Sequence, residues 1–306
     1  MNVINYITIT QKDGYKHKLT QICCSNKPKA SILILHGMAE HQKRYQAIID
    51  YLVGNDFDVY IYDHRGHGTD KKLNELGYIA PTKGYHLLVE DAIEISTYIE
   101  KNNRTNKFFL IGHSMGSLIA RNIIQTYDKY HGVILSGTTY PSKFVARMGW
   151  LVASFLKGVK GPKHNSPYLN SLLFGSKLYT SLAKRTAYDW LTRSNPVVGA
   201  YIHDPYSGFI CSTSFYQDLI KLSLQAIKKS NIKLTKRELP LYIISGNMDP
   251  VGGYGKEIKK YISILKKCNF SNVTSKIYPD CRHELFHELN RDEVFSDLLI
   301  WLSKRS

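Results

Sequence analysis

The sequence has no apolar run long enough to cross a membrane. Its longest apolar stretches are MGWLVASFL at 148–156 and LLIWL at 298–302, well short of the ~18 residues that a membrane-spanning helix needs. The first ten residues, MNVINYITIT, also lack the basic start and apolar centre of a secretory signal. We therefore expect neither a membrane anchor nor export, and we expect a location in the cytoplasm.

Paired cysteines and metal-ligand clusters are missing too. The five cysteines are odd in number, scattered and without a CxxC pair, a pattern typical of reduced thiols inside a cell. His36 and His41 lie close together, but no third histidine, cysteine or acid follows at a fitting spacing. The sequence therefore predicts no metal site.

Acidic residues are scarce, and their scarcity is uneven. The chain has 41 Lys and Arg against 25 Asp and Glu, a formal net charge of +16. No helix-turn-helix, RNP-like or zinc-finger spacing accompanies this charge, so we expect no nucleic-acid partner. Residues 139–230 contain twelve Lys and Arg, three Asp and no Glu, which gives this segment a net charge of +9.

What the chain does contain is an alternation of strand-like and helix-like segments. A hairpin is expected over 6–23 around Asp13-Gly14, because this pair supplies the positive φ of a tight turn. Runs that are apolar at every position fit strands buried on both faces of a parallel sheet. These runs are Ile32–Leu35, Val59–Tyr62, Phe108–Ile111, Val133–Leu135 and Leu241–Ile244.

The helical patterns between these runs complete the prediction of an α/β fold. Apolar residues recur on one helix face over 88–99, and Asn290, with a glutamate three positions on, predicts a capping box at the start of the last helix. The alternation favours a mostly parallel sheet with helices on both faces and right-handed crossovers. Since 139–230 shows no clear buried strand, we expect a core of residues 1–138 and 231–306 and a helical cap insertion at 139–230.

One motif at a strand-to-helix junction indicates catalysis. Residues 107–120 read KFFLIGHSMGSLIA, which matches the G-x-S-x-G pattern of a nucleophile elbow. A sharp turn would project the Ser114 hydroxyl away from the backbone, and its flanks at Gly112 and Gly116 carry no Cβ that would collide with the sheet. The helix that follows points free N–H groups at the site, where they favour a developing negative charge.

A nucleophilic serine needs a histidine base and an acid that orients it. In this fold the chain order is serine, acid, histidine. Asp249 and His283 each follow an apolar strand downstream of Ser114, at the sheet edge where catalytic groups of open α/β sheets gather. The alternatives are Asp280, which we expect in a surface turn, and His287, which we expect to be packed or solvated.

A developing oxyanion also needs two N–H donors. Met115, directly after the nucleophile, would supply one. The turn at Gly37 would bring the Met38 N–H toward Ser114 as the other. We expect His36, His41 and the histidines of DHRGHG (63–68) to orient these loops by hydrogen bonds.

Five motifs follow one another in the order of a known family: HGMAEHQKRY (36–45), DHRGHGTD (63–70), GHSMGS (112–117), SGNMDPVG (245–252) and CRHELFHELNRDEV (281–294). Together they resemble the monoacylglycerol lipase and lysophospholipase branch of the α/β-hydrolases, within the serine-aminopeptidase-like hydrolase group, which includes bacterial esterases. The resemblance covers nearly the whole chain, although 139–230 is matched mainly at DPYSGF (204–209). Two positions depart from the family: Ser117, where glycine is common, and Thr69, where serine is common.

The resemblance implies an α/β-hydrolase fold, a bacterial source and a cap over the pocket at 139–230. It also implies roles for five residues: Ser114 as nucleophile, Asp249 as acid, His283 as base, and Met38 and Met115 as oxyanion donors. Such a site performs two-step acyl transfer without a cofactor.

From the motifs and the resemblance we expect a serine carboxylesterase that acts on monoacylglycerol or lysophospholipid-type esters. The basic, partly apolar segment 139–230 favours contact with an anionic lipid surface. An aminopeptidase or amidase is the alternative enzyme, although a segment without glutamate is poorly suited to binding an N-terminal ammonium. A non-catalytic binding protein of the same fold is a third possibility, which the presence of all three triad candidates disfavours.

Overall fold

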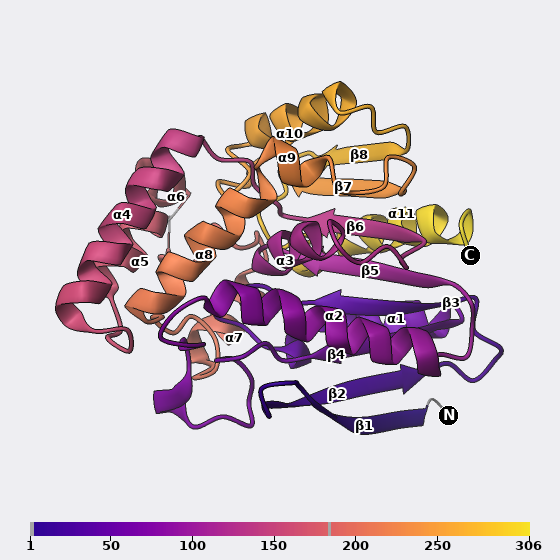
Figure 1. The fold of residues 1–306 in the computed structure, drawn as a ribbon. Helices are drawn as coiled ribbons and strands as arrows, with labels where there is room; N and C mark the ends of the chain where they lie inside the picture. Colours follow the sequence, from indigo (N-terminus) through magenta and orange to yellow (C-terminus); the bar gives the residue numbers. More distant parts are fainter. Residues whose placement is uncertain (1–2, 183–184) are drawn as a thin grey trace.

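The computed structural model describes residues 3–182 and 185–306, which contain an eight-stranded sheet (Figure 1). The strand order across the sheet is β1-β2-β4-β3-β5-β6-β7-β8. The pairs β1–β2 and β2–β4 are antiparallel and the other neighbours are parallel. The strand bounds are β1 Val3–Thr10, β2 Lys16–Cys23, β3 Ala30–Leu35, β4 Phe57–Tyr62, β5 Phe108–His113, β6 Gly132–Ser136, β7 Leu241–Gly246 and β8 Val273–Tyr278.

The predicted strands are confirmed. Each of the five fully apolar runs lies in a strand from β3 to β7, and every residue of these strands is buried. The predicted hairpin is the antiparallel pair β1–β2, with Gly14 at φ +83° in its turn. Strands with no polar face require cover on both sides, which the helices provide.

Helices cover both faces of the sheet. α2, α3 and α10 pack on one face, and the predicted apolar stripe of α2 lies in that core; α1 and α11 pack on the other face (Figure 1). Their bounds are α1 Gln46–Gly54, α2 Gly84–Asn102, α3 Met115–Ile123, α10 Lys256–Lys267 and α11 Arg291–Ser303. Short 3₁₀ turns stand at η1 Gln42–Tyr45, η2 Leu73–Glu75 and η3 Leu285–His287.

The predicted capping box at the start of α11 is wrong. Asn290 precedes the helix, but its side chain makes no hydrogen bond to the helix backbone. Its Oδ1 accepts a hydrogen bond from Arg193 Nη2 (2.6 Å), and its amide donates to Glu293 Oε2 (2.9 Å). A bond from a charged guanidinium is stronger than one from a neutral backbone amide, so Arg193 holds the side chain that would otherwise cap the helix.

The described part of residues 139–230 consists of helices joined by irregular loops and contains no strand of the sheet. Their helices are α4 Lys143–Lys160, α5 Pro167–Phe174, α6 Lys177–Thr180, α7 Asn195–His203, α8 Thr213–Ala226 and α9 Lys229–Ile232. Figure 1 shows α4–α8 gathered beyond the carboxyl ends of the parallel strands, with α8 between α4 and the core helices α2 and α3. In the described part of the chain, no helix combines the length and apolar character needed to cross a bilayer.

Asp218 joins α8 to the core. Its buried carboxylate accepts a hydrogen bond from the N–H of Gly84, the first residue of α2 (3.0 Å). A carboxylate at a helix N-terminus is favoured by the helix dipole, but no basic side chain forms an ion pair with Asp218 among the described residues. Burial raises the pKa of Asp218 to about 6, although the N–H groups of Tyr85 and Gly84 oppose this shift.

This shift predicts a pH-dependent stability for the variant Asp218→Asn. A carboxyl group whose pKa is higher in the folded than in the unfolded state stabilises the fold fully at low pH, and this contribution is lost as the pH rises through about 6. The variant, which cannot ionise, should therefore gain on the order of 1 kcal/mol relative to wild type between about pH 5 and pH 8. Urea unfolding of both proteins at the two pH values measures this gain, and an unchanged difference would contradict it.

Candidate active site

Ser114 occupies the turn between β5 and α3. Its backbone has φ +51° and ψ −117°, a combination that residues with a side chain rarely adopt and that costs about 1–3 kcal/mol. The Ser114 N–H donates to the carbonyl oxygen of Ser136 at the end of β6 (2.9 Å), and the residue is half-buried. The sharp turn predicted from the sequence is therefore present.

The two glycines that flank the turn lie where the backbone segments meet. A Cβ on Gly112 would stand 2.5 Å from the carbonyl oxygen of Gly116, and one on Gly116 would stand 2.1 Å from that of Leu35. Neither obstacle is a flexible side chain, so neither could move aside. The absence of a side chain at both positions lets α3 start directly against the end of β3.

Asp249 and His283 meet at the same edge of the sheet. The His283 Nδ1 lies 3.1 Å from both carboxylate oxygens of Asp249, and both residues are buried. Asp249 accepts two further hydrogen bonds, from the N–H of Val251 (2.9 Å) and from Ser245 Oγ (3.4 Å). The His283 ring lies 4.8 Å, centroid to centroid, from the ring of His113, the neighbour of Ser114. With Nδ1 bound to Asp249, Nε2 is the nitrogen left to act as a base.

The surroundings of His283 favour its protonated form. Burial by itself lowers the pKa of His283, but the charge of Asp249 and the hydrogen bonds to it raise that pKa, and Glu284 and Glu40 add to the rise. The pKa of His283 therefore lies above its usual value. The pKa of the adjacent His113 is lowered to about 4, first by burial and then by the charge of His283, so His113 is neutral at neutral pH.

Two backbone N–H groups belong to the segments that border Ser114, since a Cβ on Gly37 would stand 3.2 Å from the Ser114 Cβ. Met115 is the first residue of α3, and Met38 stands in the loop after β3; neither N–H has a hydrogen-bond acceptor among the described residues. Glu40 shapes the Met38 loop, since its Oε1 accepts hydrogen bonds from the Gly37 N–H (2.5 Å) and the Tyr45 hydroxyl (2.8 Å). Backbone N–H groups without an acceptor are the kind of donor that a developing negative oxygen needs.

The alternative candidates lie apart from the Asp249–His283 pair. Asp280 is exposed in a turn with φ +57°. His287 packs in η3, with Nδ1 3.2 Å from Glu284 Oε2 and Nε2 2.7 Å from the carbonyl oxygen of Arg44.

The other loop histidines bind neighbouring groups. His36 Nδ1 bonds the Gly37 carbonyl oxygen (2.7 Å), and its Nε2 accepts the His64 N–H (3.0 Å). His41 Nε2 lies 2.5 Å from Asp204 Oδ2. His67 Nε2 accepts the N–H of Ala39 (3.1 Å). Within 3–182 and 185–306, no group of three or more His, Cys, Asp or Glu residues could hold a metal ion.

Sequence reasoning missed the aromatic cover of His283. The ring of Trp190 lies 5.3 Å from that of His283 and packs against Phe174 (5.8 Å) and Tyr179 (5.2 Å). The backbone is joined as well, because the Glu284 N–H donates to the carbonyl oxygen of Leu191 (2.7 Å). Nothing in the irregular sequence around Trp190 indicates these contacts.

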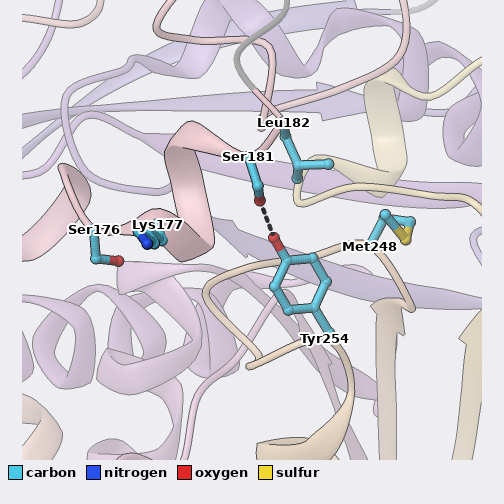
Figure 2. Close-up of a pocket in the computed structure, with 6 residues that line it drawn as sticks. All are labelled: Ser176, Lys177, Ser181, Leu182, Met248 and Tyr254. Carbon is cyan, nitrogen blue, oxygen red and sulfur yellow. Dashed lines mark hydrogen bonds between the residues drawn. The ribbon is translucent and has the colours of Figure 1, made fainter.

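A cavity of about 570 Å³ opens between α6 and the turn after β7 (Figure 2), within the size range of small-molecule sites. One wall is formed by α6 and its flanks, and the other by the turn after β7. Figure 2 shows Ser181 and Tyr254 joined across it by a hydrogen bond (3.1 Å). The lining residues are Ser176, Lys177, Ser181, Leu182, Met248 and Tyr254.

Comparison with known proteins places this site in a family context. The model of the family described as serine aminopeptidase, S33, matches residues 26–290. The chain is 25% identical to human monoglyceride lipase over 281 residues, which is 91% of this chain and 84% of that protein. It is 25% identical to the phospholipase YtpA of Bacillus subtilis over 274 residues, 89% of this chain and 94% of that one.

A solved structure shows the same fold. A highly thermostable carboxyl esterase from Bacillus coagulans, in complex with glycerol, superposes with a TM-score of 0.90 at 24% identity, over 99% of each chain. The predicted α/β-hydrolase fold, with a mostly parallel sheet and helices on both faces, is therefore confirmed.

The raised pKa of His283 predicts the pH dependence of Ser114 reactivity. Only neutral His283 can take the Ser114 proton, so labelling by a fluorophosphonate should be constant at high pH and fall as the pH drops through a midpoint above about 6.5. Asp249→Asn should lower both the rate and the midpoint, because it removes the charge that raises this pKa. Labelling rates from about pH 5 to pH 9 test both statements, and a rate independent of pH would contradict them.

Proposed function

This chain belongs to the serine aminopeptidase, S33, family, and from that premise we propose that it is a serine ester hydrolase acting on monoacylglycerol-like acyl esters. The observation that carries the proposal is the strained Ser114 turn at the same sheet edge as the buried Asp249–His283 pair. This arrangement supports acyl transfer, and the relatives named monoglyceride lipase and monoacylglycerol lipase support an ester substrate.

In the proposed mechanism, Ser114 attacks the ester carbonyl while His283 takes its proton. Asp249 holds the imidazole by Nδ1 and stabilises the imidazolium that forms. The N–H groups of Met38 and Met115 bind the oxyanion, a contribution worth about 10²-fold in rate for each donor. His283 then protonates the leaving alcohol, and water releases the acid from the acyl-enzyme on Ser114.

Aminopeptidase activity is less well supported, despite the family's description. Binding an N-terminal ammonium calls for an unoccupied carboxylate near the site, and residues 139–230 contain three aspartates and no glutamate. All three aspartates are occupied. Asp189 binds Arg185 and Thr186, Asp204 binds His41, and Asp218 binds the Gly84 N–H.

We assign residues 139–230 to a cap over the pocket and the remainder to the hydrolase core. Trp190 and its aromatic neighbours cover His283, which supports a role for the cap in shaping the substrate site. α8 serves both parts, because it packs on α4 and on core helices α2 and α3. The five cysteines are all free and buried, which supports a reducing compartment such as the cytoplasm.

We also assign the outer face of α4 to contact with an anionic lipid bilayer. An apolar stripe runs along this helix and points to solvent, with Phe144 73% and Phe155 70% exposed. Val145, Met148, Leu151 and Val159 extend the stripe, each about half exposed or more. The +9 charge of 139–230 adds attraction to anionic headgroups, so substrate in a membrane would meet the cap first.

Replacement of the nucleophile tests the activity. Ser114→Ala should lower hydrolysis of medium-chain p-nitrophenyl and glycerol esters by at least about 10³-fold, because no other group can form the acyl-enzyme. The matched control is Ser31→Ala, which removes a buried serine at the amino end of β3 and should leave the rate unchanged. Full activity of Ser114→Ala would overturn the mechanism, and faster release of an N-terminal residue from dipeptides would favour the aminopeptidase.

Loss of the exposed phenylalanines tests the membrane contact. Phe144→Ser combined with Phe155→Ser should weaken binding to phosphatidylglycerol vesicles by about tenfold or more, since each ring contributes on the order of 1–2 kcal/mol when buried in lipid. Hydrolysis of a soluble p-nitrophenyl ester should not change. Tyr6→Ser, which removes an exposed aromatic ring from β1, is the control. Equal vesicle binding by the double variant and wild type would refute the contact.

A further inference from the structure

A buried ion network joins two loops that are far apart in the sequence. Arg44, in η1, contacts Glu40 through Nη1 (2.5 Å to Oε2) and Glu284 through both terminal nitrogens (2.8 and 2.7 Å). The side chain of Arg44 is 10% exposed, and those of Glu40 and Glu284 are 3% exposed. The two carboxylates, one from each loop, thus share one guanidinium.

Each glutamate stands next to a group of the active site. Glu40 closes the loop that carries the Met38 N–H, since its Oε1 accepts the N–H of Gly37. Glu284 directly follows His283, and its own N–H is bound to Leu191. Arg44 is therefore the link between the Met38 loop and the loop that carries the base.

The cap is tied to the same point. The Arg44 guanidinium lies 4.7 Å above the ring of Tyr201 in α7, a cation–π distance. The Tyr201 hydroxyl donates to the carbonyl oxygen of Ala39 (3.1 Å), which also accepts the N–H of Gly208 (2.9 Å). The Met38 loop, the His283 loop and α7 of the cap therefore all contact the side chain of Arg44.

We propose that Arg44 is a positioning residue, which fixes the Met38 N–H relative to His283 by binding Glu40 and Glu284 at once. This inference rests on the proposed acyl-transfer function. Buried charges add little to stability compared with a well-packed apolar cluster, but the rigid fork of arginine fixes directions that lysine or apolar groups cannot. Small displacements of catalytic groups cost about 10²-fold in rate, so such a link matters at this place.

The network also acts on His283 through charge. Burial lowers the pKa of His283, whereas the charges of Asp249, Glu284 and Glu40 raise it. The other titratable groups nearby are His113, whose ring lies 4.8 Å from that of His283, and His287, whose Nδ1 lies 3.2 Å from Glu284 Oε2. Two carboxylates share one guanidinium, so a negative charge remains next to the base. A change in the network should therefore alter the pH profile of the reaction, which a purely structural role would leave unchanged.

The test compares Arg44→Lys with a matched variant at the opposite end of the strands. The matched variant is Arg104→Lys. Arg104, at the amino ends of the strands, also donates two hydrogen bonds to a buried carboxylate, that of Asp58 (2.8 and 2.6 Å). Arg44→Lys should lower kcat for p-nitrophenyl butyrate about 10- to 100-fold with little change in KM, because the lost alignment acts in the transition state. Arg104→Lys should keep kcat within about twofold of wild type. Equal kcat in the two variants, with Arg44→Lys folded, would overturn the proposal.

If Arg44→Lys does not fold, Glu284→Gln tests the positioning role of Arg44. This variant keeps the Arg44–Glu40 pair and removes one charge beside His283, so kcat should fall and the acidic limb of the pH profile should move to lower pH. An unchanged limb and an unchanged kcat would overturn the proposal. If wild type hydrolyses no ester, the proposed function fails instead, and fluorophosphonate labelling of Ser114 in the same variants still measures the positioning.

Discussion

The close contact between Gly116 and the end of β3 sets how the β5–α3 turn, which carries Ser114, meets the loop after β3. Because no side chain separates them, the first turn of α3 lies against the carbonyl oxygen of Leu35. The loop that leaves β3 then passes beside the start of α3, and a Cβ on Gly37 in this loop would stand only 3.2 Å from the Cβ of Ser114. Ser114, between the two glycines of this turn, has a positive φ of +51°.

Electrostatics then distinguishes His283, the proposed base, from the other buried histidines. His36, His64, His67 and His113 are buried, and burial lowers the pKa of each. They act as neutral hydrogen-bonding groups that shape loops. His283 is equally buried, but both oxygens of Asp249 lie beside its Nδ1 and reverse the direction of its pKa shift. Asp249, together with Glu284 and Glu40, thus separates the proposed base from the neutral imidazoles around it.

The sequence was sufficient to predict the strands and to name Asp249 and His283, which the structure brings together, for identifiable physical reasons. Strands buried on both faces must be apolar at every position, and a serine in a sharp turn needs glycine on both sides, so both leave local patterns. The Arg44–Glu284 pair leaves no local pattern, since its members stand 240 positions apart. In a sequence, an arginine and a glutamate that form a buried ion pair cannot be told from two charged residues on the surface. Trp190 lies in an irregular segment, which is held beside His283 by the hydrogen bond from the Glu284 N–H to the Leu191 carbonyl oxygen. The side chain of Asn290 binds Arg193, which is far from it in the sequence.

The backbone at Ser114 has a consequence for the stability of the whole chain. Residues with a side chain are strained in this conformation, whereas glycine adopts it freely. The fold would therefore be more stable with glycine in place of the one residue that its proposed chemistry cannot do without. Selection for activity keeps the free energy of unfolding below the greatest value that this architecture permits. The backbone strain of a single turn sets the size of that difference.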